Sequence, residues 1–499
     1  MNNKKDIITR TLEIIPGAFS WGILGVVFLL AFLKPIVCAV VIISFDFYWI
    51  VRTMYLTILL LIARRAISKY KNKDWLTECR TAFACRGLDK IYHLVIFPIY
   101  KEGPEILRAS LAAIKKANYL KDRIIVVVSF EERNPIAHQT AKILEQEFGN
   151  EFLVYLTVYH PSGLAGETNT KGANATWAAK RGKEVIEGKK IPYEDVIISC
   201  FDADTCIGKE YFSCLSYNFL TTPKPHQASY QPIPVYNNNV WYAPSFARLV
   251  EISSSFTQMI ESMRIEKFVT FSSHSMSFKT LIDINYWPVN MISDDSVIYW
   301  KAYLFYKGDY KVVPLHVTVS MDMAYSSNLF KTIIMQYKQK RRWAWGVENF
   351  PYVVSRFLID RHIPFTKKIR RSYHLLENHV TWAIWVGMIT IVPSLPILFG
   401  GIRFNQVPIG YNLPRIAGNL FNITIATSLA WILLSRTILP PRPPDVKWSK
   451  NIIMTLEWVL VPLILIIVGS TPALDAQTRL MLGKYMEFVP TEKHRNKQK

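Results

Sequence analysis

The sequence predicts an α/β domain inserted between two groups of membrane-spanning helices. Three observations lead to this fold class. Half of the 499 residues are hydrophobic, and they concentrate towards the two ends of the chain. The region between them alternates strand-like and helix-like segments, an order that predicts a parallel sheet with helices on both faces. Acidic residues follow several of these strands, where such a sheet binds its ligand.

Five apolar stretches are candidates for membrane spans. A helix needs roughly 20 apolar residues to cross the hydrocarbon core of a bilayer. The stretches are Ile23–Leu33, Pro35–Leu61, Trp382–Gly400, Ile416–Leu434 and Ile452–Ile467. The first has no evident small-x-small cleavage site and is followed by a second apolar run, so we interpret it as a retained anchor rather than a signal peptide.

The formal net charge is +21, and many basic residues border the apolar stretches. Lysine and arginine beside spans favour the cytoplasmic side and attract anionic lipid head groups. Nucleic acid is the alternative partner for such charge, but no binding motif accompanies it, so we expect membrane lipids and no nucleic acid. These features predict a multi-pass protein of the plasma or inner membrane with a cytoplasmic central domain. The sequence leaves the oligomeric state open.

Strand-like and helix-like segments alternate through the central region. The strand-like segments are short, apolar and rich in β-branched residues, which is typical of buried strands. They are Tyr92–Pro98, Arg123–Ser129, Phe152–Tyr159 and Asp195–Ser199. The helix-like segments between them are Glu105–Tyr119, Ala137–Phe148 and Ala173–Ile186.

Two carboxylates, Asp202 and Asp204, follow the fourth strand. Acids at i and i+2 beyond a strand end can share a divalent cation with two phosphate oxygens. Mg²⁺ is usually held by one or two carboxylates plus substrate phosphates, and Mn²⁺ accepts the same ligands. We therefore expect Mg²⁺ or Mn²⁺ on Asp202 and Asp204, where it would neutralise charge on a departing diphosphate. A turn with solvated acids is the alternative.

Lys171 and Asn174 stand where a glycine-containing loop leads into a helix. A helix N-terminus attracts anions, and a lysine there adds a point charge, so the segment suits a phosphate group. The alternative is a plain loop in which Asn174 is the helix N-cap.

Ser293, Asp294 and Asp295 precede a helix-like stretch, Val297–Tyr306. A base that takes a proton from a hydroxyl must be ionised and within hydrogen-bond reach. Two adjacent acids repel each other, which raises the pKa of one of them. The acids could also cap the helix, a role that is compatible with catalysis. His274 could line an acceptor site, although a simple loop histidine is the plainer interpretation.

Gln339, Arg342 and Trp343 lie in an amphipathic stretch, Ser326–Ile359, that is rich in Trp, Tyr, Arg and Lys. Such a composition is typical of a helix in the membrane interface. Arg342 can bind a phosphate bidentately, and the flat face of Trp343 can stack on a sugar ring. Anchoring at lipid head groups is the alternative role.

The order of these motifs resembles that of the membrane-integrated family 2 glycosyltransferases, which include cellulose synthase, hyaluronan synthase and ceramide glucosyltransferase. The likeness runs from Ile91 to Gly346 and extends to the flanking spans. The resemblance implies a cytosolic, Rossmann-like GT-A domain, a nucleotide-sugar donor, a divalent metal and an inverting single displacement.

The resemblance also implies roles for individual residues. Asp295 matches the catalytic base of the family's Thr-Glu-Asp motif, with Asp294 beside it near the acceptor. Asp204 would bind the metal, and Asp202 the metal or the donor ribose. Donor contacts are implied for the residues that match the Pro-x-Tyr-Asn-Glu, Lys-x-x-Asn and Gln-x-x-Arg-Trp elements, namely Pro98, Tyr100, Glu102, Lys171, Asn174, Gln339 and Arg342. Trp343 would contact the acceptor.

Two departures from the family pattern concern the nucleobase. Lys101 stands where the family usually has asparagine, and Phe130-Glu131-Glu132 replaces the usual Asp-Asp-Gly. By its position in that motif, Glu131 is expected to contact the donor.

The sequence therefore predicts an inverting, metal-dependent hexosyl- or N-acetylhexosaminyltransferase that uses a nucleotide-sugar, with UDP favoured, to extend a polysaccharide. Single-sugar transfer to a lipid or lipid-linked acceptor is one alternative, and a non-catalytic membrane scaffold or transporter with a degenerate GT-A domain is another. The predicted organisation is N-terminal spans at 1–65, the GT-A domain at 66–320, interfacial helices at 321–374, C-terminal spans at 375–485 and a basic tail at 486–499.

Overall fold

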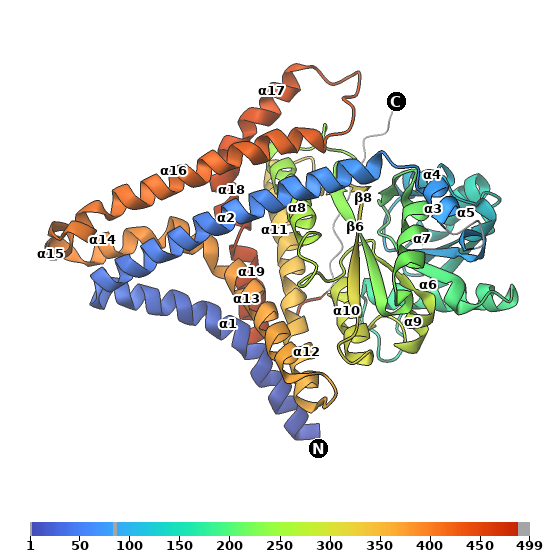
Figure 1. Cartoon of the computed structure of the whole chain (residues 1–499), viewed down its shortest axis with the longest axis horizontal. Helices are drawn as coiled ribbons and strands as arrows, with labels where there is room; N and C mark the ends of the chain where they lie inside the picture. The colour runs from blue at the N-terminus through green and yellow to red at the C-terminus, as the bar shows by residue number, and fades with distance from the viewer. Residues whose placement is uncertain (1, 83–86, 488–499) are drawn as a thin grey trace. The chain divides into compact units, whose positions relative to one another are not determined.

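The computed structural model describes residues 2–82 and 87–487 of the chain (Figure 1). These residues form two compact units. A helical unit joins the residues up to Leu61 with Ala243–Val250 and Ser326–Met486. An α/β unit joins Ile62–Tyr242 with Glu251–Tyr325. The predicted basic tail lies almost wholly outside the described residues.

An eight-stranded sheet forms the α/β unit within the described residues, in the order β3-β2-β1-β4-β7-β6-β8-β5. The strands are β1 (Tyr92–Ile99), β2 (Ile124–Glu131), β3 (Val154–His160), β4 (Val196–Cys200), β5 (Cys206–Ile207), β6 (Ala228–Tyr236), β7 (Ser275–Ser277) and β8 (Lys311–Met321). Strands β1 to β4 pair in parallel. The four strands that the sequence predicts are therefore confirmed, as is the parallel arrangement of this half of the sheet.

The other half of the sheet is mixed, and here the expectation of a parallel sheet is wrong. Strand β7 runs antiparallel to β4 and β6, and β5 runs antiparallel to β8. Strand β7 is only three residues long and polar, so it carries no apolar run from which a strand could be predicted. Strand β6 contains Pro232 and Pro234 and is irregular between Gln231 and Ile233, because proline cannot donate a ladder hydrogen bond.

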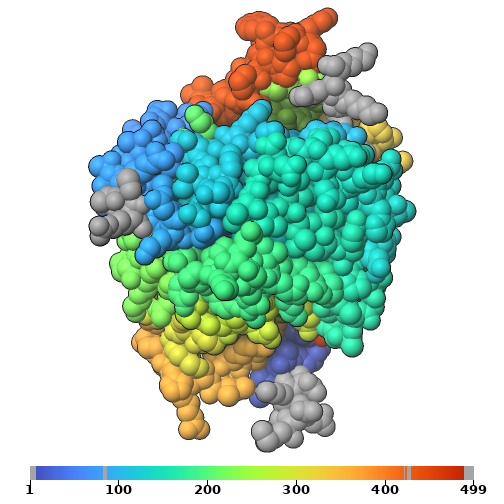
Figure 2. Space-filling view, turned by 90° about the vertical axis from the view of Figure 1, so that its right-hand side faces the viewer, coloured from blue at the N-terminus to red at the C-terminus, as the bar shows by residue number. Residues whose placement is uncertain are grey.

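Helices cover both faces of the parallel half. On one face, α4 (Pro104–Lys115), α5 (Ala137–Phe148) and α7 (Tyr211–Thr221) share a buried apolar cluster with the side chains of alternate strand residues, such as Val95 and Phe97. On the other face lies α6 (Lys171–Gly188), whose Gly182 packs against Leu94. The residues of this half, coloured blue-green to green, form a continuous surface in Figure 2.

The helical unit contains the segments that are suited to crossing a membrane. Three helical segments of the described residues are long and apolar enough, namely Ile7–Leu33 in α1 (Asn2–Leu33), Pro35–Lys71 (α2) and Ser449–Met481. A bent pair, Phe365–Thr390 (α13) with Val392–Phe399, becomes a fourth if it forms one span. The predicted stretch Ile416–Leu434 falls inside α16 (Pro408–Thr437), where the side chains at 421 and 424–428 lie outside the described residues. A fifth span therefore stays a prediction.

A buried ion pair lies within the last of these segments. Glu457 accepts hydrogen bonds from Arg248 Nη1 at 2.7 and 3.0 Å and from Ser245 Oγ at 2.7 Å. Both charged side chains are buried. Removing one partner of such a pair leaves an uncompensated buried charge, at a cost of about 3–5 kcal/mol. The pair explains how an apolar segment accommodates a glutamate.

The close packing of α6 on β1 gives a test of this fold. A Cβ at Gly182 would lie 2.8 Å from Leu94 Cδ2, whereas one at Gly188, in the same helix, meets nothing within 4 Å. We expect Gly182→Val to lower the free energy of unfolding by about 1–3 kcal/mol through overpacking. Gly188→Val is the matched control, and thermal unfolding of both variants in detergent measures the difference. Equal unfolding midpoints would contradict the packing of α6 described here.

Candidate active site

The N-terminus of α6 lies against the segment that carries the predicted base. Thr170 caps this helix and accepts a hydrogen bond from Ala173 N, so the alternative of Asn174 as N-cap is wrong. A Cβ at Gly172 would lie 2.5 Å from the Pro288 carbonyl oxygen and 3.0 Å from Asp294 Cβ. Only glycine permits this approach, which brings the start of α6 to the start of α10 (Asp294–Phe305).

Lys171 connects two of the predicted motifs. Its Nζ lies 2.7 Å from Asp202 Oδ1 and 2.9 and 3.1 Å from the two carboxylate oxygens of Asp295. Burial alone would lower the pKa of Lys171, but the two carboxylates outweigh it and raise this pKa well above its ordinary value. The ammonium therefore stays charged and joins the acid after β4 to the acid that opens α10.

Asp295 is the more accessible of the two adjacent acids. About 26% of its side chain is exposed, and its backbone carbonyl accepts a hydrogen bond from Thr270 Oγ1 at 2.7 Å. His274 Nδ1 lies 3.7 Å from Asp295 Oδ1. Burial lowers the pKa of His274, so the imidazole is neutral near pH 7. His274 is thus a neighbour of the predicted base. Its position in the sequence, in an apparent loop, did not predict this contact.

Asp294 is buried, and its Oδ2 has no hydrogen-bond partner among the described residues. Burial, followed by the adjacent charge of Asp295, raises the pKa of Asp294 well above its ordinary value. Burial disfavours the charged form of a carboxyl, so Asp294 holds a proton more readily than a carboxyl in water does.

Asp202 and Asp204 differ in their surroundings as well. About a quarter of the Asp202 side chain is exposed, and its Oδ2 accepts a hydrogen bond from Ser272 Oγ at 2.6 Å. Asp204 is fully buried, and its Oδ2 accepts a hydrogen bond from the backbone N–H of Asp322 at 2.7 Å. Asp202 therefore faces the site, and Asp204 fixes the turn after β4 to the end of β8.

The donor set suits a cation that arrives with a phosphate ligand. No group of three His, Cys, Asp or Glu residues that could hold a metal ion occurs in residues 2–82 and 87–487. Mg²⁺ usually has one or two carboxylate ligands from the protein beside substrate phosphates. Asp202 and Asp204 are two such carboxylates, and Asp202 is the accessible one. The residues present therefore fit a divalent metal that a diphosphate helps to hold.

A second polar cluster lies at the ends of β2 and β3, where Glu131 and His160 are register partners. His160 Nδ1 is 3.1 Å from Glu131 Oε1, and its Nε2 is 2.9 Å from Glu167 Oε2. Burial alone would lower the pKa of His160, but the two carboxylates outweigh it and raise this pKa. Arg133 Nε lies 3.3 Å from Glu131 Oε2. Glu131 is thus held between two cationic groups.

The other predicted donor residues surround the end of β1. Pro98 is buried in β1, and Tyr100 follows it with the guanidinium of Arg133 4.9 Å from its ring centroid. Glu102 Oε2 accepts hydrogen bonds from the backbone N–H groups of Tyr100 and Lys101. Asn174 Nδ2 donates to the carbonyl oxygen of Ile99, the last residue of β1, and to that of Ser129 in β2.

Gln339, Arg342 and Trp343 belong to the helical unit, in α11 (Leu329–Ala344). Gln339 is buried, and the ammonium of Lys340 lies 3.7 Å from the centroid of the Trp343 ring. Arg341 Nη1 donates to Asp475 Oδ2 at 2.8 Å, which ties α11 to α19 (Thr471–Met481). The motif is therefore carried by a helix that an ion pair fixes within its own unit.

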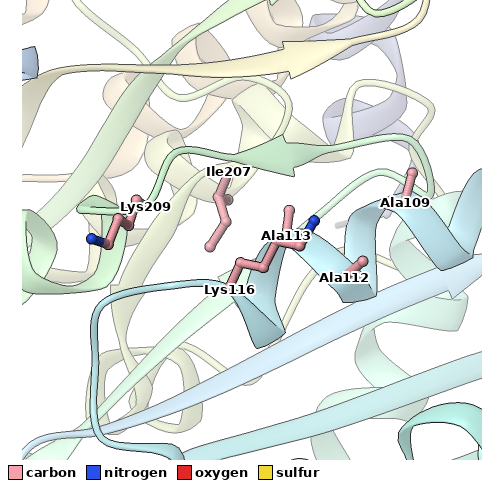
Figure 3. A pocket seen from close by; sticks show the side chains of 6 residues that line it. All are labelled: Ala109, Ala112, Ala113, Lys116, Ile207 and Lys209. Carbon is pink, nitrogen blue, oxygen red and sulfur yellow. The ribbon is translucent and has the colours of Figure 1, made fainter.

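A surface depression of about 540 Å³ lies elsewhere, between α4 and the end of β5 (Figure 3). It is lined by Ala109, Ala112, Ala113, Lys116, Ile207 and Lys209. None of the predicted site residues borders it, and no acid or base suited to proton transfer does so either. We therefore place the candidate active site at the carboxyl ends of β1, β2 and β4.

A family model, described as glycosyl transferase family group 2, matches residues 197–468, which is more than half of the chain. This chain belongs to that family. The matched region includes Asp202, Asp295 and the Gln-x-x-Arg-Trp motif. The family membership confirms the resemblance to family 2 glycosyltransferases seen in the sequence.

Solved structures with similar folds are distant from this glycosyltransferase. A mannosyltransferase from Pyrobaculum calidifontis, solved with GDP-Man and Mn²⁺, has a TM-score of 0.44 and 13% identity over 89% of this chain and 100% of that chain. Residues 1–349 of TarS from S. aureus, solved with UDP-GlcNAc, have a TM-score of 0.36 and 14% identity over 82% and 98%. The search of curated protein sequences gave no match.

The cluster around His160 predicts a pH dependence of stability. A histidine whose pKa is raised in the folded state stabilises the protein fully below its unfolded pKa, near 6.5, and this contribution is lost as the pH rises through the folded value. We therefore expect the unfolding midpoint to fall more steeply above pH 6.5 in the wild type than in His160→Gln. Thermal unfolding between pH 5.5 and 9 measures both slopes, and parallel curves would contradict the cluster.

Proposed function

We propose that this chain is an inverting, metal-dependent glycosyltransferase that moves a sugar from a nucleotide-sugar, with UDP-sugars as the first candidates, to a growing polysaccharide at a membrane. The contact of one ammonium, that of Lys171, with both Asp202 and Asp295 carries this proposal. It brings the acid expected at the diphosphate and the expected base within reach of a single side chain. A single displacement requires such proximity.

In this reaction the oxygen of an acceptor hydroxyl attacks the anomeric carbon of the donor sugar. The proton of that hydroxyl passes to Asp295, and the bond between the anomeric carbon and the β-phosphate oxygen breaks. Its electron pair stays on the departing nucleoside diphosphate, and the new glycosidic bond has the inverted configuration. Asp295 suits the role of base because it is accessible and held in place through Thr270.

Asp202, Asp204 and Lys171 would serve the diphosphate. Asp202 and Asp204 would hold Mg²⁺ or Mn²⁺, which would neutralise the departing charge as a Lewis acid. Lys171 adds a cation at the N-terminus of α6, where the helix dipole also favours an anion. Tyr100, whose ring packs against the guanidinium of Arg133, is proposed to contact the nucleotide together with Glu131, Pro98, Glu102 and Asn174.

From the order of the family's motifs, Gln339 and Arg342 of α11 are proposed to contact the donor and Trp343 the acceptor sugar. Asp294, which stands beside the proposed base, is proposed to lie near the acceptor. The candidate spans support an integral membrane protein, and we propose several passes with the GT-A domain on the cytoplasmic side.

The different burial of the two adjacent acids gives a kinetic test. Asparagine has nearly the shape of a carboxyl, and burial disfavours a charge at Asp294, so Asp294→Asn should keep most of the activity, within about tenfold of the wild type. Asp295→Asn removes the base and should lower kcat by roughly 10²–10⁴-fold. Release of nucleoside diphosphate in lipid nanodiscs measures both variants. If Asp294→Asn were the inactive one, the base assignment would have to be exchanged.

A panel of UDP- and GDP-sugars with Mg²⁺, Mn²⁺ or EDTA tests the reaction class. We expect one donor to release its nucleotide only when a divalent metal is present, and the anomer of the product to be the opposite of that in the donor. Long chains in the product would identify a polysaccharide synthase. A single sugar on extracted lipid would instead identify a lipid as the acceptor. Release in EDTA equal to that in Mg²⁺ would refute metal dependence.

A further inference from the structure

Three carboxylate oxygens surround the ammonium of Lys171. Its Nζ donates hydrogen bonds to both oxygens of Asp295, at 2.9 and 3.1 Å, and forms an ion pair with Asp202 Oδ1 at 2.7 Å. A phosphate oxygen that binds this ammonium therefore competes with these carboxylates for it.

We propose that Lys171 couples donor binding to release of the base: without donor its ammonium holds Asp295, and the diphosphate of the donor takes over this ammonium and frees Asp295 for the acceptor hydroxyl. The proposal rests on the proposed function, because it assigns the diphosphate to this side of the sheet. It makes Lys171 a positioning residue for the reaction and orders the substrates, with the donor binding before the acceptor.

The geometry favours exchange at Asp295 over exchange at Asp202. Asp202 is itself an expected phosphate-side residue, so an ammonium that stays beside it remains next to the diphosphate. The backbone carbonyl of Asp295 accepts a hydrogen bond from Thr270, so the start of α10 keeps its place when the ammonium turns away. Lysine carries its charge on a flexible four-carbon stem, which allows the short movement without a change in the backbone.

The exchange also keeps the proposed base occupied until a donor is bound. While both oxygens of Asp295 accept hydrogen bonds from Lys171, an acceptor hydroxyl has to compete with the ammonium for them. Only the arrival of a diphosphate, with its higher negative charge, removes this competition. The base is thus available when a sugar is present to be transferred.

Binding of nucleoside diphosphates tests the proposal without catalysis. Calorimetry with UDP and GDP in Mg²⁺, on the full chain in nanodiscs, should give tighter binding to Asp295→Asn than to the wild type. We expect about threefold or more, the factor that loss of a partly exposed ion pair allows. Lys171→Met should bind more weakly, and the double variant should bind as Lys171→Met does. Asp309→Asn, which removes an exposed carboxylate paired with Lys224, is the charge-matched control.

Two results would overturn the coupling. The first is equal or weaker nucleotide binding by Asp295→Asn than by the wild type. The second is tighter binding that persists when Asp295→Asn is combined with Lys171→Met, since relief of charge repulsion alone would then explain the tighter binding. If the wild type binds UDP or GDP and Asp295→Asn binds it no more tightly, the proposed function stands and only the coupling fails. Failure of the wild type to bind either nucleotide overturns the proposed function and the coupling together. Asp295→Ser replaces Asp295→Asn if thermal unfolding shows that the latter is misfolded.

Discussion

The ion pairs of Lys171 with Asp202 and Asp295 are the interaction on which the rest of the site depends. Asp202 comes from the end of β4 and Asp295 from the start of α10, while Lys171 opens α6. Two carboxylates this close to one another would repel strongly in a half-buried site without a cation between them. The ammonium therefore determines how these three elements can meet, and the absent side chain of Gly172 allows their backbones to approach closely enough.

The same burial gives each acid of the cluster a separate chemical character. Burial raises the pKa of Asp294, Asp295 is more accessible and pairs with Lys171, Asp202 accepts a hydrogen bond from Ser272, and Asp204 accepts one from the backbone N–H of Asp322. These four chemically identical side chains therefore have different surroundings. Their surroundings, rather than their identity, make their chemical properties differ.

Ion pairs serve a purely structural purpose in the helical unit. Arg248 neutralises Glu457 inside an apolar segment, and Asp475 holds Arg341 of α11. Charges in such surroundings are costly unless they are paired, so each pair specifies which helices must lie together. The helix that carries Gln339, Arg342 and Trp343 is fixed in this way to α19.

The sequence by itself determined the four parallel strands, the helices between them and the family, because buried strands and helices have a local periodicity and the motifs stand in a fixed order. It could not determine the antiparallel strand β7 or the partners of β5, since these segments are too short to show a period. It also could not show that burial raises the pKa of Asp294, or that Lys171, Ser272 and His274 lie beside the acids. Those facts depend on burial and on distances between residues far apart in the chain, which only the tertiary structure decides.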